Sequence, residues 1–374
     1  MEFILPKPLF STKKKSFKKQ RKKNRSLICF FNKLHQNNYF MQIKFPLSLL
    51  SATLICFTAF SQASYKVAKT FPIKSSGGWD YIAVNNGKVY VSHGTQVNIL
   101  NEKTGDSIGV IEGTTGVHGI AFDNDLHRGY TSNGRLNNVF VFDLSSNKVL
   151  NQIATGENPD AISFEPFSKK IITCNGRSKS LSVIDPQKNT VIATIDLDGK
   201  PEEAVSDGKG KLFVNLEDKS QIAEVDMKNY KVLNRWPIAP GESATGLALD
   251  KKTNRLFAGC DNKMLIVADA TNGKVITSVP IGDGCDGVVF DPKNDLVFAS
   301  CGEGIMTVIK EKDANHFAVA QTVSTQPSAR TIALDLENNT LFLPAATLAP
   351  ADPNATTRRR SFVPDSFKVL VVKE

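Results

Sequence analysis

The chain repeats one block of sequence at a spacing of about 42 residues, and this repeat limits the folds that it can form. Gly119-Ile-Ala-Phe-Asp123 is matched 42 residues later by Ala161-Ile-Ser-Phe-Glu165. The triplet Asn133-Gly-Arg135 returns at the same offset as Asn175-Gly-Arg177. A period of this length, built from short apolar runs and polar turns, is typical of propellers and solenoids.

Each repeat begins with an apolar run that ends in an acid or Asn. These ends recur seven times, at Asn85, Asp123, Glu165, Asp207, Asp250, Asp291 and Asp335. Their spacing stays between 38 and 44 residues, so no whole strand is gained or lost. Three more β-type runs follow in each repeat, and alternation of apolar and β-branched residues between polar turns is the signature of strands. We name the four strands of a repeat A to D in chain order.

We therefore predict an all-β fold, a seven-bladed β-propeller of four-stranded blades. The expected blades cover approximately residues 75–113, 114–156, 157–199, 200–241, 242–283, 284–326 and 327–374 plus 64–74. A lone sheet cannot bury both faces, so blades must stack, and a closed ring leaves no exposed ends. The last repeat stops one strand short, so we expect the N-terminal run Tyr65–Ile73 to pair with it and to close the ring.

The first 63 residues have the pattern of a leader. Met41-Gln-Ile-Lys44 precedes an apolar run over residues 45–60, which is short for a membrane span, and the small residues Ser61-Gln-Ala63 follow. We predict a signal peptide over residues 41–63, cut after Ala63, and export to the periplasm or the cell surface. Residues 1–40, with the basic run Lys13–Arg25, are expected to be a disordered, over-extended leader.

The basic character of the chain is confined to this leader. Residues 1–63 hold 12 of the 46 Lys and Arg but one of the 37 Asp and Glu, so residues 64–374 hold 34 basic and 36 acidic residues, a formal charge of about −2. This balance gives no general electrostatic reason to bind nucleic acid. We expect a monomer that meets a membrane only during export.

The strand motifs point to a family. Tyr90-Val-Ser-His93 and Tyr130-Thr-Ser-Asn133 occupy the same place in two repeats, and Gly156-Glu-Asn-Pro159 forms a turn between repeats. These motifs resemble the YVTN-repeat propellers, and in particular the exported YncE-like group, over the whole of residues 64–374. The resemblance implies the propeller fold but no agreed activity. DNA binding, linked to one type of member, finds little support in the charge of residues 64–374.

Propeller geometry predicts where a site would lie. The D-to-A and B-to-C loops emerge on one face, and the position five residues before each strand A end should ring the mouth of the central channel there. This ring consists of Asp80, His118, Asp160, Glu202, Thr245, Asp286 and Arg330. Either the acids cap their own turns or pair with Arg330, or several converge on an amine or a divalent cation. The candidate metal ligands are Asp80, His118, Asp160, Glu202 and Asp286.

The B-to-C loops add further polar residues to this face, and the predicted ligand-binding set also contains His93, Asn133, Arg135, Asn175, Arg177 and Glu217. Arg135 and Arg177 suit an anionic ligand, although we expect them to pair with Asp160 or Glu202. The long B-to-C loop of the last repeat, residues 345–366, carries three consecutive arginines, Arg358 to Arg360. It is either a lid over the channel mouth or a hairpin tip.

Cysteines and standard motifs limit the chemistry. Residues 64–374 contain Cys174, Cys260, Cys285 and Cys301, and a disulfide from Cys285 to Cys260 or Cys301 is sterically reasonable in an oxidising compartment. No CxxC, CxxCH, HExxH or GxSxG motif and no phosphate loop occurs. The sequence names no cofactor by a strong motif.

Two classes of function fit these observations. The first is a non-catalytic binding or interaction module whose polar face engages a small charged ligand or a protein partner. The alternative is an enzyme that uses the same face, either a metal-dependent hydrolase of the lactonase type or a dehydrogenase-like propeller. Fold alone does not separate them, because propellers carry unrelated functions.

Overall fold

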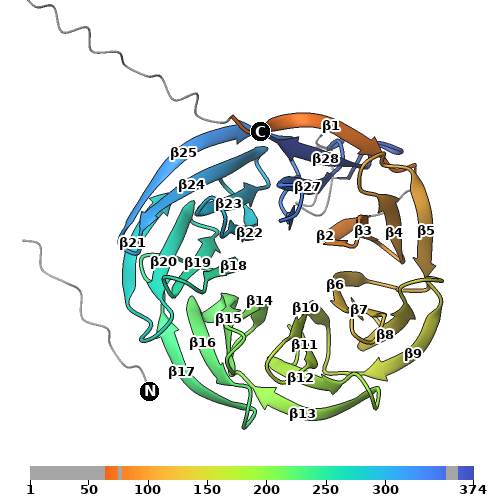
Figure 1. The fold of residues 1–374 in the computed structure, drawn as a ribbon, viewed down its shortest axis with the longest axis horizontal. Coiled ribbons are helices and arrows are strands. Elements are labelled where there is room, and N and C mark those ends of the chain that lie inside the picture. Colours follow the sequence, from red (N-terminus) through yellow and green to blue (C-terminus); the bar gives the residue numbers. More distant parts are fainter. Residues whose placement is uncertain (1–63, 75–77, 351–360) are drawn as a thin grey trace, which may run out of the picture. The chain divides into compact units, whose positions relative to one another are not determined.

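The structure, a computed structural model, describes residues 64–74, 78–350 and 361–374. Apart from one short 3-10 turn, the regular structure of these residues is β-strand. Seven antiparallel sheets of four strands stand in a ring, which confirms the predicted seven-bladed propeller (Figure 1). The predicted leader and signal peptide, the cut after Ala63 and the three consecutive arginines lie outside the described residues. Among those described, no helix has the length and apolar character needed to cross a bilayer.

The two inner strands of each blade are short and largely buried. The innermost strands are β2 (Trp79–Asn85), β6 (Val117–Asp123), β10 (Pro159–Glu165), β14 (Pro201–Ser206), β18 (Ala244–Asp250), β22 (Cys285–Asp291) and β26 (Ala333–Asp335). The second strands are β3 (Lys88–His93), β7 (Arg128–Asn133), β11 (Lys170–Asn175), β15 (Lys211–Leu216), β19 (Arg255–Cys260), β23 (Leu296–Cys301) and β27 (Thr340–Ala345).

The third strands are β4 (Gln96–Asn101), β8 (Asn138–Asp143), β12 (Ser180–Asp185), β16 (Gln221–Asp226), β20 (Met264–Asp269), β24 (Ile305–Asp313) and β28 (Lys368–Lys373). The outer strands are β5 (Ser107–Glu112), β9 (Val149–Ala154), β13 (Thr190–Asp196), β17 (Lys231–Pro237), β21 (Val275–Pro280), β25 (His316–Ser324) and β1 (Lys66–Pro72). The 3-10 turn η1 (Glu217–Lys219) lies between β15 and β16.

The core lies between neighbouring blades. Side chains of the second and third strands are apolar on both sides, so each blade presents an apolar face to the blade before it and to the blade after it. One cluster, for example, joins Tyr90 and Ile99 of the first blade to Val117, Ile120 and Phe142 of the second. Burial of these faces removes apolar surface from water, which is the main favourable contribution to folding.

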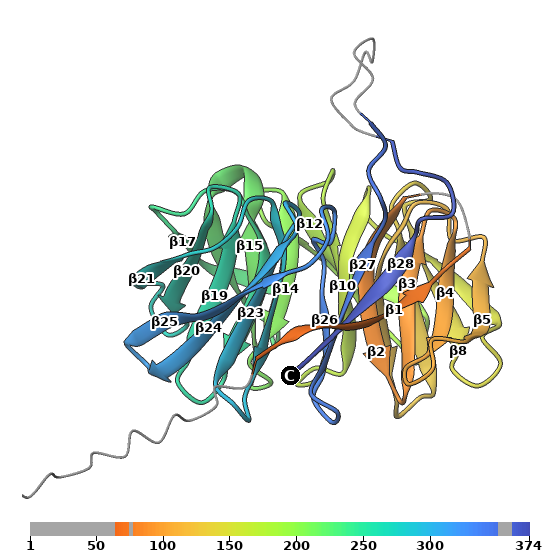
Figure 2. The same cartoon turned by 90° about the horizontal axis from the view of Figure 1, so that it is seen from above.

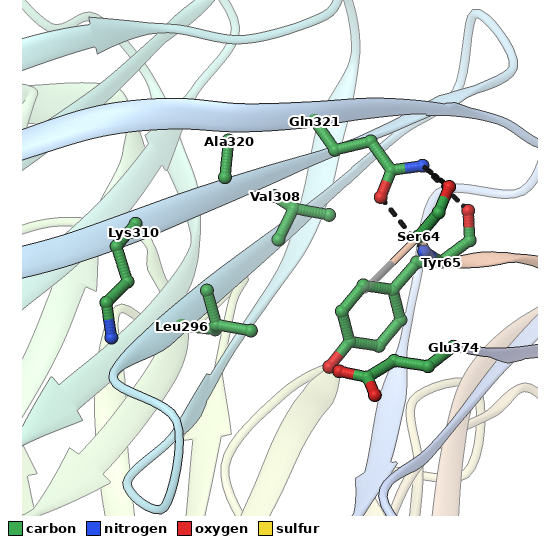
Figure 3. A pocket seen from close by; sticks show the side chains of 8 residues that line it. All are labelled: Ser64, Tyr65, Leu296, Val308, Lys310, Ala320, Gln321 and Glu374. Carbon is green, nitrogen blue, oxygen red and sulfur yellow. Dashed lines mark hydrogen bonds between the residues drawn. The ribbon is translucent and has the colours of Figure 1, made fainter. Parts of the chain in front are cut away.

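The two ends of the described chain meet in one blade. β1 pairs with β28 in antiparallel register, with Phe71 opposite Val369. The segment that enters β1 is also tied to the preceding blade: Gln321 of β25 accepts a hydrogen bond from the backbone N–H of Tyr65 (2.9 Å) and donates to its carbonyl (2.8 Å). The Tyr65 ring packs edge-on against Phe298 at 5.0 Å. Figure 3 shows Gln321 and Tyr65 at this junction, beside a small pocket lined by Leu296, Val308 and Ala320.

The loops divide between two faces of the ring, as Figure 2 shows from the side. On one face, B-to-C loops bond to the D-to-A loop of the same blade, as when the Gly134 N–H donates to the Gly116 carbonyl (2.8 Å) and the Gly176 N–H to the Asn158 carbonyl (2.9 Å). On the other face, the acid that ends the inner strand caps the A-to-B turn, as when Asp123 accepts from the Leu126 N–H (3.1 Å). We call the first the polar face and the second the turn face.

Candidate functional site

A β-bulge in the innermost strands positions the predicted ring residues. Six of these strands shift register against their neighbour at one place, and Asp80, His118, Asp160, Glu202, Thr245 and Asp286 lie within those shifts. A bulge re-aims side chains that strict alternation would direct between the blades. All seven ring residues, Arg330 included, line cavities at the polar face.

Hydroxyl groups hold this irregular backbone in place. Ser132 at the end of β7 donates to the Asp160 carbonyl of the next blade, and Ser300 does the same for the Arg330 carbonyl (2.5 Å). Thr331 donates to the Asp80 carbonyl (2.5 Å). The Ser of the Tyr-Thr-Ser-Asn motif is therefore a support for the neighbouring blade's site residue.

Two cavities occupy the polar face. We call the outer one the funnel; it has a volume of about 640 Å³ and is lined by residues that include Trp79, Asp80, His118, Arg135, Asn158, Arg177, Arg330 and Phe362. We call the other the acidic pocket; its volume is about 220 Å³ and its lining is Asp80, Tyr81, Asp160, Lys200, Glu202, Glu217, Thr245, Asp286 and Arg330. The two cavities share Asp80 and Arg330.

Asp80 is the centre of an ion-pair network whose members come from five blades. One of its carboxylate oxygens lies 2.5 Å from His118 Nδ1, and the other lies 2.7 Å from an Arg330 terminal nitrogen. Arg330 also bonds Asp286 at 3.1 Å, and His118 Nδ1 is 3.6 Å from Asp160. The predicted pairing of ring acids with Arg330 is thus found for two of them, Asp80 and Asp286.

Lys200 compensates the negative charge of two further carboxylates of the acidic pocket, and it was not among the residues predicted from the sequence. Its amine lies 2.6 Å from Glu202 and also bonds Glu217 of the adjacent B-to-C loop. The signal for it was its place in the D-to-A loop, directly before the inner strand that carries Glu202. Glu217, which was predicted, does lie in the pocket.

Three carboxyl groups of the acidic pocket, those of Asp160, Asp286 and Glu202, have raised pKa values. Burial raises the pKa of Asp160 to about 6, with His118 opposing and Asp80 adding to the rise. Burial likewise raises the pKa of Asp286 to about 7 against the lowering effect of Arg330. For Glu202, burial and then the charge of Asp160 raise the pKa to about 8. Burial is the main cause of all three shifts, and neighbouring carboxylates add to each of them.

The pKa of His118 is shifted in the direction that favours the charged imidazole. Burial alone lowers its pKa, but the hydrogen bond to Asp80 and the charges of Asp160, Asp80 and Glu202 outweigh burial, so the pKa is raised above 6.5. A protonated imidazole at this position donates to Asp80 and counts as a third cation of the site.

Arg135 and Arg177 behave differently from our expectation. We expected them to pair with Asp160 or Glu202, but within the described residues no carboxylate lies within 4 Å of either guanidinium. Both side chains are exposed at the funnel, and the Arg135 stem packs over Gly116. Because each B-to-C loop is bonded to its own D-to-A loop, the two arginines are held at the rim and do not reach the acids. Both residues line the funnel.

Three predicted site residues lie inside blades. His93 is 2% exposed, with its ring stacked on Phe367 at 4.2 Å. Asn133 is buried and donates to the Asn138 side chain, and Asn175 is buried and donates to two serines of β12. All three residues end strand B. The two asparagines satisfy polar groups of their own blades, His93 packs against the last blade, and none of the three lines the funnel.

The base of the long loop contributes an aromatic wall. Leu348 and Phe362 form a bridge, and the Phe362 ring packs against Trp79 at 4.4 Å. Both rings line the funnel. Residues 351–360 lie outside the described part of the chain, so the lid function stays a prediction.

The cysteines of the described region are buried free thiols. Cys285 and Cys301 lie opposite each other in β22 and β23, which is the closest approach to the disulfide considered from the sequence. The hydrogen bond to Cys301 and burial raise the pKa of Cys285. Because all four thiols are buried, they are poorly accessible to reagents.

The molecule is thus a seven-bladed β-propeller with a charged funnel and an acidic pocket on one face. No family model matches the sequence, and no curated protein matches it. Among solved structures, a chain of the hydrazine synthase of Kuenenia stuttgartiensis is similar in fold, with a TM-score of 0.63 over 72% of this chain and 94% of that chain. Sequence identity is 14%. This similarity shows the propeller fold alone, and membership of the YncE-like group stays a prediction.

Proposed function

We propose that the protein is an exported binding module, and that its funnel holds a small dipolar ligand with an anionic group and a cationic group. The observation that carries this proposal is the separation of charge across the polar face. Two guanidinium groups at the rim have no carboxylate partner among the described residues, while carboxylates outnumber cations in the acidic pocket. A ligand that matches both parts gains two charge-assisted contacts at once.

The rim suits the anionic group. Arg135 and Arg177 come from adjacent blades at equivalent positions and have no carboxylate partner within 4 Å among the described residues. Guanidinium groups bind carboxylate or phosphate through paired N–H donors. The neighbouring Asn158 side chain also lines the funnel and supplies a neutral amide.

The acidic pocket suits the cationic group. Five carboxylates line it, Asp80, Asp160, Glu202, Glu217 and Asp286, against the two permanent cations Lys200 and Arg330. Burial, with a smaller contribution from the neighbouring carboxylates, raises the pKa values of Asp160, Asp286 and Glu202. A bound ammonium group would stabilise the ionised carboxylates, because opposite charges at short range favour the charged form.

Calorimetric titration of the full chain tests this proposal. The probes are ω-amino acids of three to eight carbons, each compared with the monocarboxylate and the monoamine of the same length. We expect at least one ω-amino acid to bind more tightly than both of its singly charged analogues. The double variant Arg135→Gln/Arg177→Gln should weaken that binding tenfold or more, which corresponds to a loss of about 1.4 kcal/mol of binding free energy.

A matched control removes two charges elsewhere. Lys188 and Lys228 are exposed in C-to-D loops on the turn face, so Lys188→Gln/Lys228→Gln should leave the affinity within twofold. The proposal is wrong if no ω-amino acid exceeds both of its singly charged analogues, or if the control pair weakens binding as much as the arginine pair.

A second candidate function is supported by one specific arrangement. A carboxylate oxygen of Asp80, a ring nitrogen of His118 and a carboxylate oxygen of Asp160 all lie within 4.8 Å of one another. Two carboxylates and one imidazole suit a divalent cation such as Mn²⁺, Fe²⁺ or Zn²⁺. Such an ion would leave positions for water and would supply the chemistry of a metal-dependent hydrolase.

Titration with Mn²⁺ and Zn²⁺ separates this candidate from the first. Binding to the full chain should be lost in Asp160→Asn and retained in Asp313→Asn. Asp313 lies beside His316 in the C-to-D hairpin between β24 and β25, on the turn face. Equal binding by both variants, or none by the parent protein, would remove the metal-dependent candidate while leaving the dipolar ligand untouched.

A further inference from the structure

A further cavity, next to the acidic pocket, is lined largely by the innermost strands. Its volume is about 450 Å³, within the range of small-molecule sites. Lys251 and Leu336, both in A-to-B turns, line it, so it extends to the turn face. Tyr81 and Asp286 line both this cavity and the acidic pocket. We call it the turn-face cavity.

Tyr81 separates the turn-face cavity from the polar face. It belongs to β2 of the first blade, but its ring packs against a core cluster of the third and fourth blades that contains Ala161, Ala204 and Val214. The side chain therefore crosses the axis of the ring. Its burial, followed by the charges of Asp160 and Glu203, raises its pKa well above 10, so the phenol stays neutral.

Most of the walls of this cavity are apolar, and its charged lining residues are Glu203, Asp286 and Lys251. Val205, Leu249, Phe290 and Leu334 come from four blades and line the cavity. Glu203, one residue into the β14 bulge, also lines it. The Glu203 carboxylate accepts a hydrogen bond from the adjacent Ala204 N–H at 3.3 Å. Within residues 64–74, 78–350 and 361–374, no Lys, Arg or His nitrogen lies within 4 Å of it.

The environment of Glu203 differs from that of the other acids near the axis. Asp80 and Asp286 are bonded to Arg330, and Glu202 is bonded to Lys200. For Glu203, burial raises the pKa to about 7, and the charges of Asp160, Asp286 and Asp80 add to that rise. A buried carboxylate without a cation is costly, which makes the site favourable for an incoming positive charge.

We propose that the turn-face cavity binds a small amine that carries an apolar body, with its ammonium group at Glu203 and its body along the apolar walls. Two carboxylates, Glu203 and Asp286, line the cavity against one lysine, Lys251 in an A-to-B turn, so the lining disfavours an anionic occupant. A neutral occupant would leave the Glu203 charge uncompensated. The Tyr81 ring adds an aromatic face, which attracts a cation when the ammonium group lies over it. This site goes beyond the dipolar ligand of the funnel, because its lining lacks Arg135, Arg177 and His118.

The first test compares four probes on the unaltered full chain by calorimetry. They are 2-phenylethylamine, 2-phenylethanol, 3-phenylpropionate and methylamine, which separate charge from apolar body. We expect 2-phenylethylamine to bind at least tenfold more tightly than each of the other three. The proposal is overturned if the alcohol or the propionate binds as tightly as the amine, or if the amine does not bind.

The second test locates the amine with single neutral substitutions of similar shape. Glu203→Gln should weaken 2-phenylethylamine binding tenfold or more. Glu337→Gln removes an exposed carboxylate on the same face, next to Leu336, and should change the affinity less than twofold. Glu202→Gln tests the acidic pocket: a loss there combined with unchanged binding in Glu203→Gln would place the amine at the polar face and overturn the proposal. If Glu203→Gln does not fold, Glu202→Gln locates the amine: unchanged binding supports the turn-face cavity, and a tenfold loss places the amine in the acidic pocket and overturns the proposal.

Discussion

His118 Nδ1 lies 2.5 Å from an Asp80 carboxylate oxygen, although the two residues belong to inner strands of different blades. The contact depends on ring packing, because only neighbouring blades bring residues 38 positions apart to this distance. Asp80 is held on its other side by Arg330 of the last blade. A single carboxylate therefore joins the second blade to the seventh through the first.

The first prediction concerns the protonation of His118. Because the hydrogen bond to Asp80 and the nearby acids outweigh burial, the His118 pKa should be above 6.5. Asp80→Asn replaces the charged acceptor by a neutral amide, so the His118 pKa should fall. NMR titration of the imidazole resonances of the full chain measures both values.

Asp313→Asn provides the control for this titration. Asp313 contacts the exposed His316 at 2.8 Å, so its substitution should move the His316 resonance and leave His118 unchanged. A His118 pKa at or below 6.5 in the unaltered protein, or one indifferent to Asp80→Asn, would mean that the two side chains do not interact in solution.

The second prediction concerns stability as a function of pH. The pKa values of Asp160, Asp286 and Glu202 are raised to about 6, 7 and 8, so the folded protein binds protons more tightly than the unfolded chain. Stability should therefore fall as pH rises from about 4 through about 8. The raised pKa of His118 acts in the same direction, since its contribution is complete below about 6.5 and is lost at higher pH.

Glu202→Gln should reduce the loss of stability that accompanies rising pH. The variant should match the parent near pH 5, where Glu202 is protonated, and should melt about 2 °C or more higher near pH 9, where the parent buries an ionised carboxylate. Glu217 stays as a partner for Lys200 in the variant. Thermal unfolding at several pH values gives the curves, and Glu337→Gln should run parallel to the parent. Parallel curves for Glu202→Gln as well would show that its pKa is not raised.

Much of this architecture could be predicted from the sequence. The strand ends recur at an almost constant interval, so the number of blades, the strands of each blade and the ring of seven residues follow from counting. The bulges did not follow from counting. Strict alternation left open whether Asp160 or Glu202 faces the axis or packs between blades, and the small residues Gly119, Gly246 and Gly287 directly after the ring position were the available sign of a bulge.

The pairing of charges could not be predicted for a different reason. Arg135 lies close in sequence to potential partners, but a distance within 4 Å depends on side-chain direction and on loop-to-loop hydrogen bonds. Lys200 was overlooked because its neighbours Gly199 and Pro201 made the segment look like an ordinary turn. Tyr81 was overlooked because the side chain of one strand crosses the axis to blades far away in the sequence.

The third prediction concerns Ser132, which supports the bulge of the next blade. Its hydroxyl accepts from the Gly119 N–H at 2.8 Å and donates to the Asp160 carbonyl. Ser132→Ala leaves two buried backbone groups without this partner and should destabilise the protein by about 1–3 kcal/mol. Urea unfolding measures the change. Ser107→Ala, at an exposed position of β5, should stay within about 0.5 kcal/mol, and a similar result for Ser132→Ala would deny it a supporting role.

The fourth prediction concerns the close contact between neighbouring inner strands. A Cβ atom at Gly119 would lie 2.8 Å from Ile162 Cγ2 and 3.0 Å from the Ile162 backbone nitrogen, and this backbone belongs to the bulge that carries Asp160. Gly119→Ala should therefore push β10 away and cost about 1–3 kcal/mol in urea unfolding.

Gly78→Ala is the matched control, because no atom lies within 4 Å of the Cβ that it would add. Replacing Gly by Ala also restricts the unfolded chain, which stabilises a protein by about 0.4–1 kcal/mol where the folded backbone tolerates the side chain. The two substitutions should thus have opposite signs, although they add the same methyl group at the edge of the same face. If Gly119→Ala proves as stable as the parent, the inner strands are less closely packed than the structure places them, and Asp160 need not be held where it meets His118.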